Sequence, residues 1–240
     1  MNDNPNSNSN HKPLIVAEIG INHNGDLETA KHLVDAAKYA GAHAVKFQTY
    51  WNFSPESKQY EFIPFKWNCL FNYCNMANVR WFSTPFTMEA IEFLRNYGQK
   101  VWKVPSNRTV LANIPLLKKI STQVGSKIIS LGASGLKETE ALHRIFGSQA
   151  IYCYCISEYP APLEKLQPFM FNQIKRFGQF GFSDHSLSIA APCFAVECGA
   201  VYIEKHITLD RKQKGPDHKA SLEPEEFKLM VDMIGMVKRS

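Results

Sequence analysis

Polar residues that suit acid, base and ligand chemistry recur inside segments that are otherwise apolar. Side chains two positions apart on a strand share a face, so each such set points to one side of its segment. Ser157 and Tyr159 keep this phase only if extended structure continues past Cys155. Five segments carry these sets: Glu18; Lys46 and Gln48; Ser157 and Tyr159; Ser183 and His185; Glu204 and His206.

His185 and His206 are the pair best suited to hold a divalent cation. Neutral imidazole nitrogens bind such ions, and water and a substrate oxygen would fill the other positions, an arrangement typical of Lewis-acid catalysis. The alternative is a hydrogen-bonded polar layer without chemistry, which barrels also contain. Burying a lysine, two glutamates and two histidines without a function would be costly. The pattern therefore favours a catalytic site.

Eight short apolar segments alternate with longer amphipathic ones, and this order predicts a (β/α)8 TIM barrel of the α/β class. We expect residues 1–12 to be a disordered tail and residues 13–240 to be one barrel domain. The segment from Tyr50 to Pro64 is predicted to be a loop over the barrel mouth, where such enzymes keep their chemistry. The predicted strands are Leu14–Gly20, Ala44–Thr49, Trp81–Thr84, Val101–Val104, Lys127–Leu131, Ile151–Ile156, Gly178–Ser183 and Val201–Ile207.

Helix boundaries are marked by residues that commonly cap helices. Asp26 is expected to begin the first helix and Gly41 to end it, and Thr87 and Gly98 bracket the third helix in the same way. Pro224 suits the first turn of the last helix.

Composition excludes several classes of protein. No apolar run is long enough for a membrane helix and no secretion signal begins the chain, so we expect a cytoplasmic protein without a membrane partner. The net charge of +5 is spread along the sequence, which favours a small anionic ligand over nucleic acid. The six cysteines lie in apolar patterns and are expected to be reduced core thiols.

The segments that carry these residues resemble the sialic acid synthase family, in order from about Pro13 to the last helix. The matching motifs are Ala17-Glu-Ile-Gly-Ile-Asn-His-Asn-Gly25, Val45-Lys-Phe-Gln-Thr49, Ser83-Thr-Pro-Phe86, Phe182-Ser-Asp-His185, Glu204-Lys-His206 and Gly215-Pro-Asp-His-Lys-Ala-Ser-Leu222. The resemblance implies a metal-dependent transferase of the N-acetylneuraminate synthase type. Such an enzyme condenses phosphoenolpyruvate with N-acetylmannosamine or a related aminosugar, using Mn²⁺ or Mg²⁺, to give a nonulosonic acid and phosphate.

The resemblance also implies roles for individual residues. Glu18 would contact the C1 oxygen of the open-chain sugar and is a candidate proton carrier. Glu18, Lys46 and His206 are the candidate catalytic residues, and His185 and His206 are the candidate metal ligands. Phosphoenolpyruvate would be held by Lys46, Lys127, Ser130 and Ser183. The sugar side would be lined by Gln48, Tyr159 and Asp217, and Ser157 and Glu204 complete the expected substrate-binding residues.

Strand phase supports only part of this assignment, because Lys127 and Ser130 fall on opposite phases. The sequence also departs from the family at Pro105-Ser-Asn-Arg108, where Gly-Ser-Gly-Glu or Pro-Ser-Gly-Glu is usual, and at Ser130-Leu-Gly-Ala133, where Ser-Thr-Gly-Met is usual. The loop after the second strand is shorter than usual. The sequence lacks the family's antifreeze-like C-terminal domain, so we expect a different substrate, a homodimer, or a separate chain that supplies this domain.

Two other functions remain open at this point. The chain could be a non-catalytic or regulatory barrel, although the joint presence of Glu18, Lys46, His185 and His206 argues against it. It could also be another carbon–carbon lyase or aldolase in which Lys46 or Lys205 forms a Schiff base. The phase of Lys205 points away from the barrel interior, which argues against that lysine.

Overall fold

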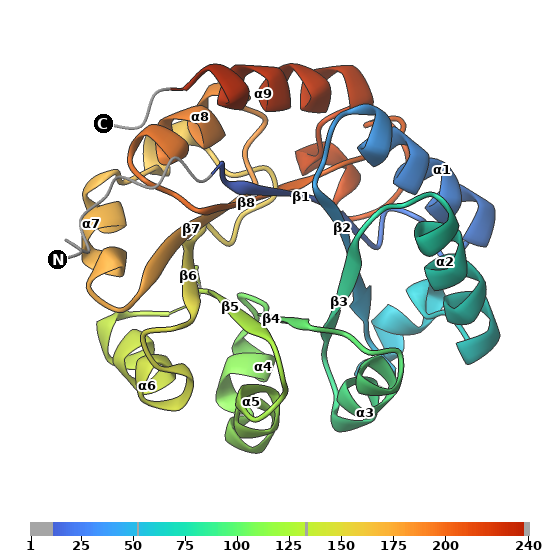
Figure 1. Cartoon of the computed structure of the whole chain (residues 1–240), viewed down its shortest axis with the longest axis horizontal. Helices are drawn as coiled ribbons and strands as arrows, with labels where there is room; N and C mark the ends of the chain where they lie inside the picture. The colour runs from blue at the N-terminus through green and yellow to red at the C-terminus, as the bar shows by residue number, and fades with distance from the viewer. Residues whose placement is uncertain (1–11, 52, 133, 238–240) are drawn as a thin grey trace, which may run out of the picture.

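The computed structural model describes residues 12–51, 53–132 and 134–237, so nearly all of the predicted N-terminal tail lies outside the described residues. Eight parallel strands form a ring with helices around it, which confirms the predicted barrel (Figure 1). The strands are β1 Leu14–Gly20, β2 Ala44–Thr49, β3 Trp81–Pro85, β4 Val101–Val104, β5 Ser126–Ser130, β6 Ile151–Tyr154, β7 Gln179–Asp184 and β8 Tyr202–His206. The helices are α1 Leu27–Tyr39, η1 Pro55–Tyr60, α2 Pro64–Met76, α3 Met88–Asn96, α4 Arg108–Ala112, α5 Ile114–Ser121, α6 Leu136–Phe146, η2 Leu163–Lys165, α7 Phe169–Lys175, α8 Ala190–Glu197, η3 His218–Ala220 and α9 Pro224–Met236.

The hydrogen-bonded order of the strands is β3-β2-β1-β8-β7-β6-β5-β4, and β3 and β4 pack against each other to close the ring. Each strand lies within two residues of its predicted bounds at either end. The difference that matters is at β6, which ends at Tyr154 instead of Ile156. Strand phase therefore does not place Ser157 and Tyr159, because β6 ends before it reaches them.

Local capping marks where α1 and α3 begin, as predicted. The Asp26 side chain accepts a hydrogen bond from the backbone N–H of Thr29 at the start of α1. Thr87 caps α3 in the same way, by accepting from the backbone N–H of Ala90. Gly41 follows α1 with a φ of 80°, a conformation that glycine adopts without a steric penalty.

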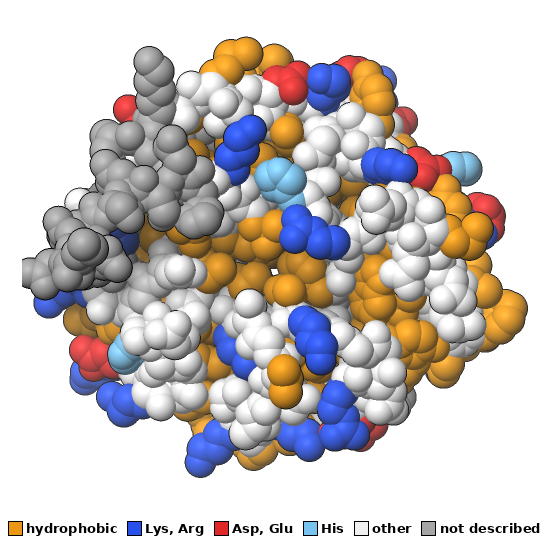
Figure 2. Space-filling view, viewed as in Figure 1, with side chains coloured by type: hydrophobic (Ala, Val, Ile, Leu, Met, Phe, Trp, Pro, Cys, Tyr) orange, Lys and Arg blue, Asp and Glu red, His pale blue; other side chains and the backbone are white. Residues whose placement is uncertain are grey.

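Hydrophobic side chains fill both sides of the strand ring. A large cluster packs between the strands and the helices, and a smaller one fills the interior. In the view along the ring, hydrophobic side chains occupy the centre of the visible face and basic side chains surround it (Figure 2). The barrel is therefore a packed core and not a pore. The interior cluster consists of Val16, Ala44, Phe82, Ile128, Cys153 and Tyr202.

Six free cysteines lie in the described parts of the chain. Three of them are buried and three are partly exposed: Cys74, Cys153 and Cys155, and Cys69, Cys193 and Cys198. Among the described residues, no helix combines the length and the apolar character needed to span a membrane.

Candidate active site

Strand register brings the predicted polar residues to two adjacent levels of the barrel. Glu18 on β1 lies opposite Lys46 on β2 and opposite His206 on β8. Ser183 on β7 lies opposite Glu204 on β8. All five side chains are buried, near the carboxyl ends of their strands. This is the end at which barrel enzymes carry out their chemistry.

Two buried lysines flank the carboxylate of Glu204. The Lys46 Nζ atom lies 2.5 Å from Glu18 Oε2 and 3.8 Å from Glu204 Oε1, and it donates a hydrogen bond to Thr84 Oγ1. The Lys103 Nζ atom lies 3.2 Å from Glu204 Oε1 and donates to Ser130 Oγ over 2.7 Å. These contacts join β1, β2, β3, β4, β5 and β8 in one network of charges and hydroxyls.

The two carboxyl groups of this network differ in pKa. Burial raises the pKa of Glu18 to about 7, with Lys46 opposing the shift and Glu204 adding to it. Burial acts to raise the pKa of Glu204 too, but Lys103, Lys46 and two hydrogen bonds hold it well below its ordinary value. Glu18 therefore exchanges a proton near neutral pH, while Glu204 stays ionised. With Glu18 protonated, two ammonium groups face one carboxylate, and the excess positive charge suits an anion.

His185 and His206 lie side by side at the same end of the barrel, with ring centroids 5.7 Å apart. His185 donates from Nδ1 to the Ile156 carbonyl over 2.6 Å, which leaves Nε2 to accept a hydrogen bond from the Tyr159 hydroxyl. His206 Nδ1 is buried without a hydrogen-bond partner and lies 3.9 Å from Asp217 Oδ2. Burial lowers the pKa of His185 to about 4 and that of His206 well below its ordinary value.

The two imidazoles fit a divalent cation. Both are neutral at physiological pH, and each keeps a ring nitrogen that no backbone group occupies. Within the described part of the chain, His185 and His206 belong to no set of three or more His, Cys, Asp or Glu side chains that could ligate a metal. Water and substrate oxygens would have to complete the coordination, which is how catalytic sites stay open.

Gln48, Gly20 and Asp217 form the side of the site next to Glu18. Gln48 Nε2 donates to Glu18 Oε1 over 2.8 Å, and the Tyr50 hydroxyl donates to Gln48 Oε1. Gly20 has a φ of 54°, and a Cβ atom there would lie 2.9 Å from Glu18 Oε1 and 3.5 Å from Asp217 Oδ2. Burial raises the pKa of Asp217 to about 6. Asp217 thus joins the cluster from the segment after β8, as the resemblance implies.

Ser157 and Tyr159 reach the site differently from the prediction. They belong to the segment after β6, and Ser157 is exposed and hydrogen-bonded to Ser106 Oγ over 2.8 Å. Tyr159 is 46% exposed, but its ring stacks on His185 with centroids 4.2 Å apart. The loop, rather than strand phase, places Tyr159 beside the histidines. Ser157 is linked to the buried polar cluster through Ser106, which contacts the same buried thiol, Cys155, as Ser130 does.

Lys127 is not part of the site, which corrects the placement that the resemblance implied. It is the second residue of β5, at the opposite end of the barrel, and its Nζ atom donates to the carbonyls of Gln123 and Gly125. Lys103 occupies the position expected for Lys127. Sequence reasoning missed it, although a lysine between Trp102 and Val104 in a short apolar strand is the same signal that identified Lys46.

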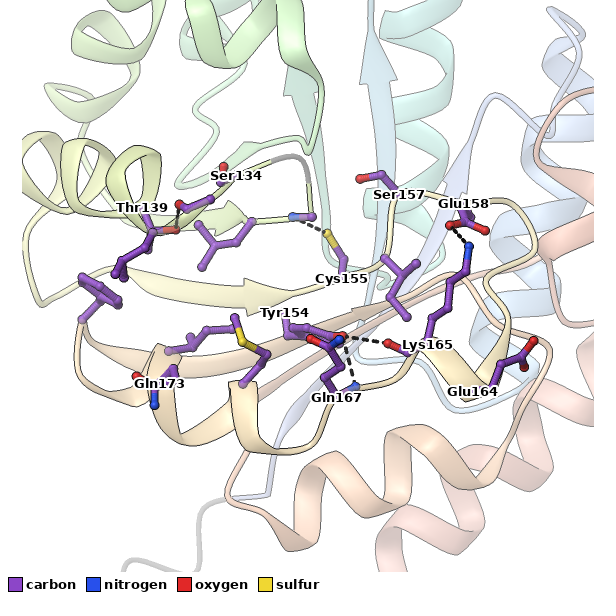
Figure 3. A pocket seen from close by; sticks show the side chains of 18 residues that line it. Ser134, Thr139, Tyr154, Cys155, Ser157, Glu158, Glu164, Lys165, Gln167 and Gln173 are labelled. Atoms are coloured by element: carbon purple, nitrogen blue, oxygen red, sulfur yellow. Dashed lines mark hydrogen bonds and ion pairs between the residues drawn. The ribbon is translucent and has the colours of Figure 1, made fainter.

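A separate cavity of about 770 Å³ lies outside the ring of strands, between α6 and α7 (Figure 3). Cys155 and Ser157 line it, and a Lys165–Glu158 ion pair lies at one side. The buried lysines and histidines are not among its lining residues. This cavity is therefore distinct from the candidate active site.

Comparison with known proteins gives consistent matches. The NeuB family model matches residues 55–240. The N,N'-diacetyllegionaminic acid synthase of Campylobacter jejuni is 34% identical over 95% of this chain and 77% of its own length. A pseudaminic acid synthase of the same species is 33% identical over 95% of this chain and 75% of its length. The crystal structure of an N-acetylneuraminic acid synthetase from Leptospira borgpetersenii, in complex with citrate, superposes with a TM-score of 0.87 at 31% identity, covering 95% of this chain and 84% of that one.

Proposed function

This chain belongs to the NeuB family, and from that membership and its barrel mouth we propose that it condenses phosphoenolpyruvate with an N-acetylated aminosugar. The products would be a nonulosonic acid and phosphate. The observation that carries the proposal is the pair of buried lysines, Lys46 and Lys103, that lie beside two neutral histidines. Named relatives are synthases of legionaminic and pseudaminic acids, which fits a substrate of this class.

The lysines and the nearby hydroxyls would hold phosphoenolpyruvate. Lys46 and Lys103 approach Glu204 from β2 and β4, and Ser130 and Ser183 lie within hydrogen-bonding distance of the same network. Phosphate and carboxylate oxygens accept charge-assisted hydrogen bonds from ammonium groups, and hydroxyls add neutral donors. These buried contacts would shield the bound anion from water, and they would also fix its orientation.

Glu18 would move a proton during the reaction. The enol carbon of phosphoenolpyruvate would attack the C1 aldehyde of the sugar, water would add at C2, and phosphate would leave with cleavage of the C–O bond. The aldehyde oxygen gains a proton and the attacking water loses one. A carboxyl group with a pKa of about 7 can act in either direction at neutral pH. Lys46 and Lys103 would stabilise the charge on the departing phosphate.

His185 and His206 would hold Mn²⁺ or Mg²⁺, whose chemistry here is to polarise the aldehyde oxygen of the sugar. Burial keeps both rings neutral, the form in which imidazole is a ligand. The Ile156 carbonyl fixes the tautomer of His185 by accepting from Nδ1. This contact leaves Nε2 on the side of the Tyr159 hydroxyl, without a backbone partner.

The experiment that tests the proposal measures phosphate release from phosphoenolpyruvate with a panel of N-acetylated aminosugars, with and without Mn²⁺. We expect release that depends on both an aminosugar and the metal. Borohydride should trap no covalent adduct, because Lys46 is paired with Glu18 and Lys205 faces away from the barrel interior. Trapping of either lysine, or phosphate release without any sugar, would contradict the proposed condensation.

A further inference from the structure

Among the residues that the structure describes, Lys205 is the most thoroughly buried charged group outside the active site. It lies on β8 with 0% exposure, and its side chain points away from the barrel interior. The Nζ atom lies 2.5 Å from Asp184 Oδ2 and donates to the carbonyl oxygens of Ser186 and Ser188, the latter over 3.1 Å. One ammonium group thus has three oxygen partners, which matches its three N–H donors.

The three partners of Lys205 lie on either side of His185 in the sequence. Asp184 precedes His185, and Ser186 follows it. The segment is also tied to itself, because Asp184 Oδ1 accepts from the backbone N–H of Ser186 and Ser186 Oγ accepts from that of Ser188. A single side chain of β8 therefore holds both the Asp184 carboxylate before His185 and the backbone carbonyls after it.

Lys205 is also next to the second histidine in the sequence. His206 follows Lys205, and the two residues project to opposite sides of β8. Register places Asp184 opposite Lys205. The Lys205–Asp184 link therefore joins β7 and β8 at the level from which His185 and His206 face the barrel mouth.

We propose that Lys205 is a positioning residue that fixes the separation and orientation of the His185 and His206 imidazoles, and so pre-organises them for a divalent cation. The inference rests on the proposed metal role of these histidines. Lys205→Met would keep the length of the side chain but remove all three donors, leaving Asp184 and two backbone carbonyls without their partner. His185 would keep its hydrogen bond to the Ile156 carbonyl, but the backbone that follows it would lose its contacts with Lys205.

The first test is titration of folded Lys205→Met and wild-type protein with Mn²⁺ alone, followed by electron paramagnetic resonance of the free ion. We expect the dissociation constant to rise about 10- to 100-fold, as for other groups that support metal ligands. Lys205→Arg, which keeps the charge but changes the geometry of the donors, should lose less and serves if the Met variant does not fold. Tyr152→Phe, on β6, is the matched control, because it removes a hydrogen bond to the Gly147 carbonyl, away from His185 and His206. It should leave Mn²⁺ affinity unchanged.

The second test needs no metal and separates this inference from the proposed function. In ¹⁵N spectra of histidine-labelled wild-type protein, His185 should show the Nδ1-protonated neutral tautomer, with its signal assigned by comparison with His185→Gln. In Lys205→Met we expect that signal to shift or broaden. If wild-type protein binds no Mn²⁺, the metal role fails and the His185 signal alone decides the positioning role. An unchanged signal, or unchanged Mn²⁺ affinity in a wild type that binds it, would overturn the role of Lys205.

Discussion

At the scale of single residues, the ionisation of Glu18 sets the charge that an incoming substrate meets. Its pKa of about 7 comes from burial beside Glu204, which is itself held ionised by Lys103 and Lys46. An arriving anion would add a further negative charge near Glu18 and favour its protonated form. Substrate binding and proton loading of Glu18 would then support each other.

The lysines give a direct test of the anion site. Lys46→Met and Lys103→Met should each weaken phosphoenolpyruvate binding at least tenfold, because each removes a charged partner from a buried site. Lys127→Met is the control and should leave that affinity unchanged, since its ammonium binds carbonyls at the other end of the barrel. Calorimetry with phosphoenolpyruvate measures all three. A loss at Lys127 but none at Lys103 would restore the assignment implied by the resemblance.

The histidines give a test of the metal. His185→Ala and His206→Ala should each lose bound Mn²⁺ and more than tenfold in rate, because several kcal/mol of Lewis-acid stabilisation are removed. Chelation should abolish the activity of the wild type, and added Mn²⁺ should restore it. Metal content by mass spectrometry and steady-state rates measure both effects. A double variant that is metal-free and fully active would exclude the metal role.

At the scale of elements, the end of β1 shapes the site. The register of β1 against β2 shifts between Glu18 and Gly20, and Gly20 has a positive φ of 54°. A side chain there would press on the Glu18 carboxylate and approach Gln48 and Asp217. The strand end thus needs glycine both for its backbone conformation and for the space beside Glu18.

Gly20→Ala should therefore impair catalysis more than folding. We expect a stability loss of about 1–2 kcal/mol from the left-handed backbone, measured by chemical denaturation. We expect a fall in kcat of at least tenfold, because the new Cβ displaces the Glu18 carboxylate. Gly98→Ala is a control, since Gly98 has a φ of 75° but a Cβ atom there would meet no atoms within 4 Å. Equal losses of activity in both variants would show that backbone strain alone is responsible.

At the scale of the whole molecule, buried neutral histidines make the fold sensitive to acid. His23, in the segment between β1 and α1, is fully buried and accepts a hydrogen bond from the Gly25 backbone N–H at Nδ1. Burial, with Lys66 nearby, lowers its pKa to about 3. Between pH 6.5 and 3 the unfolded chain binds a proton at this position that the native protein does not. Stability should therefore fall as the pH drops through that range.

His23→Asn should make this dependence shallower. The asparagine oxygen can accept from Gly25, but the residue does not titrate. Below about pH 6.5, the free energy of unfolding should fall with decreasing pH more steeply in the wild type than in the variant. The two slopes should differ by up to about 1.4 kcal/mol per pH unit. Above that pH the two curves should run parallel. Urea denaturation across this pH range measures the difference, and identical slopes in the acidic range would show that His23 is protonated in the native state.

The sequence by itself determined the barrel, its eight strands and most of the polar residues at its mouth. These features depend on local periodicity, because strand phase decides which face a side chain occupies whatever the neighbouring strands do. Glu18, Lys46, Ser183, Glu204 and His206 follow from phase alone, and their cluster is what the structure brings together.

Only the tertiary structure decided the position of each side chain along the barrel axis and the partners that it contacts. The resemblance implies Lys127 at the site, but its ammonium binds the Gln123 and Gly125 carbonyls at the far end of the barrel. Lys103 belongs to the site through its contacts with Ser130 and Glu204, which only the structure shows. Tyr159 reaches His185 through a loop whose path depends on packing across the barrel. The three partners of Lys205 come together only when β7 docks beside β8, because register and stagger between strands are set by non-local contacts.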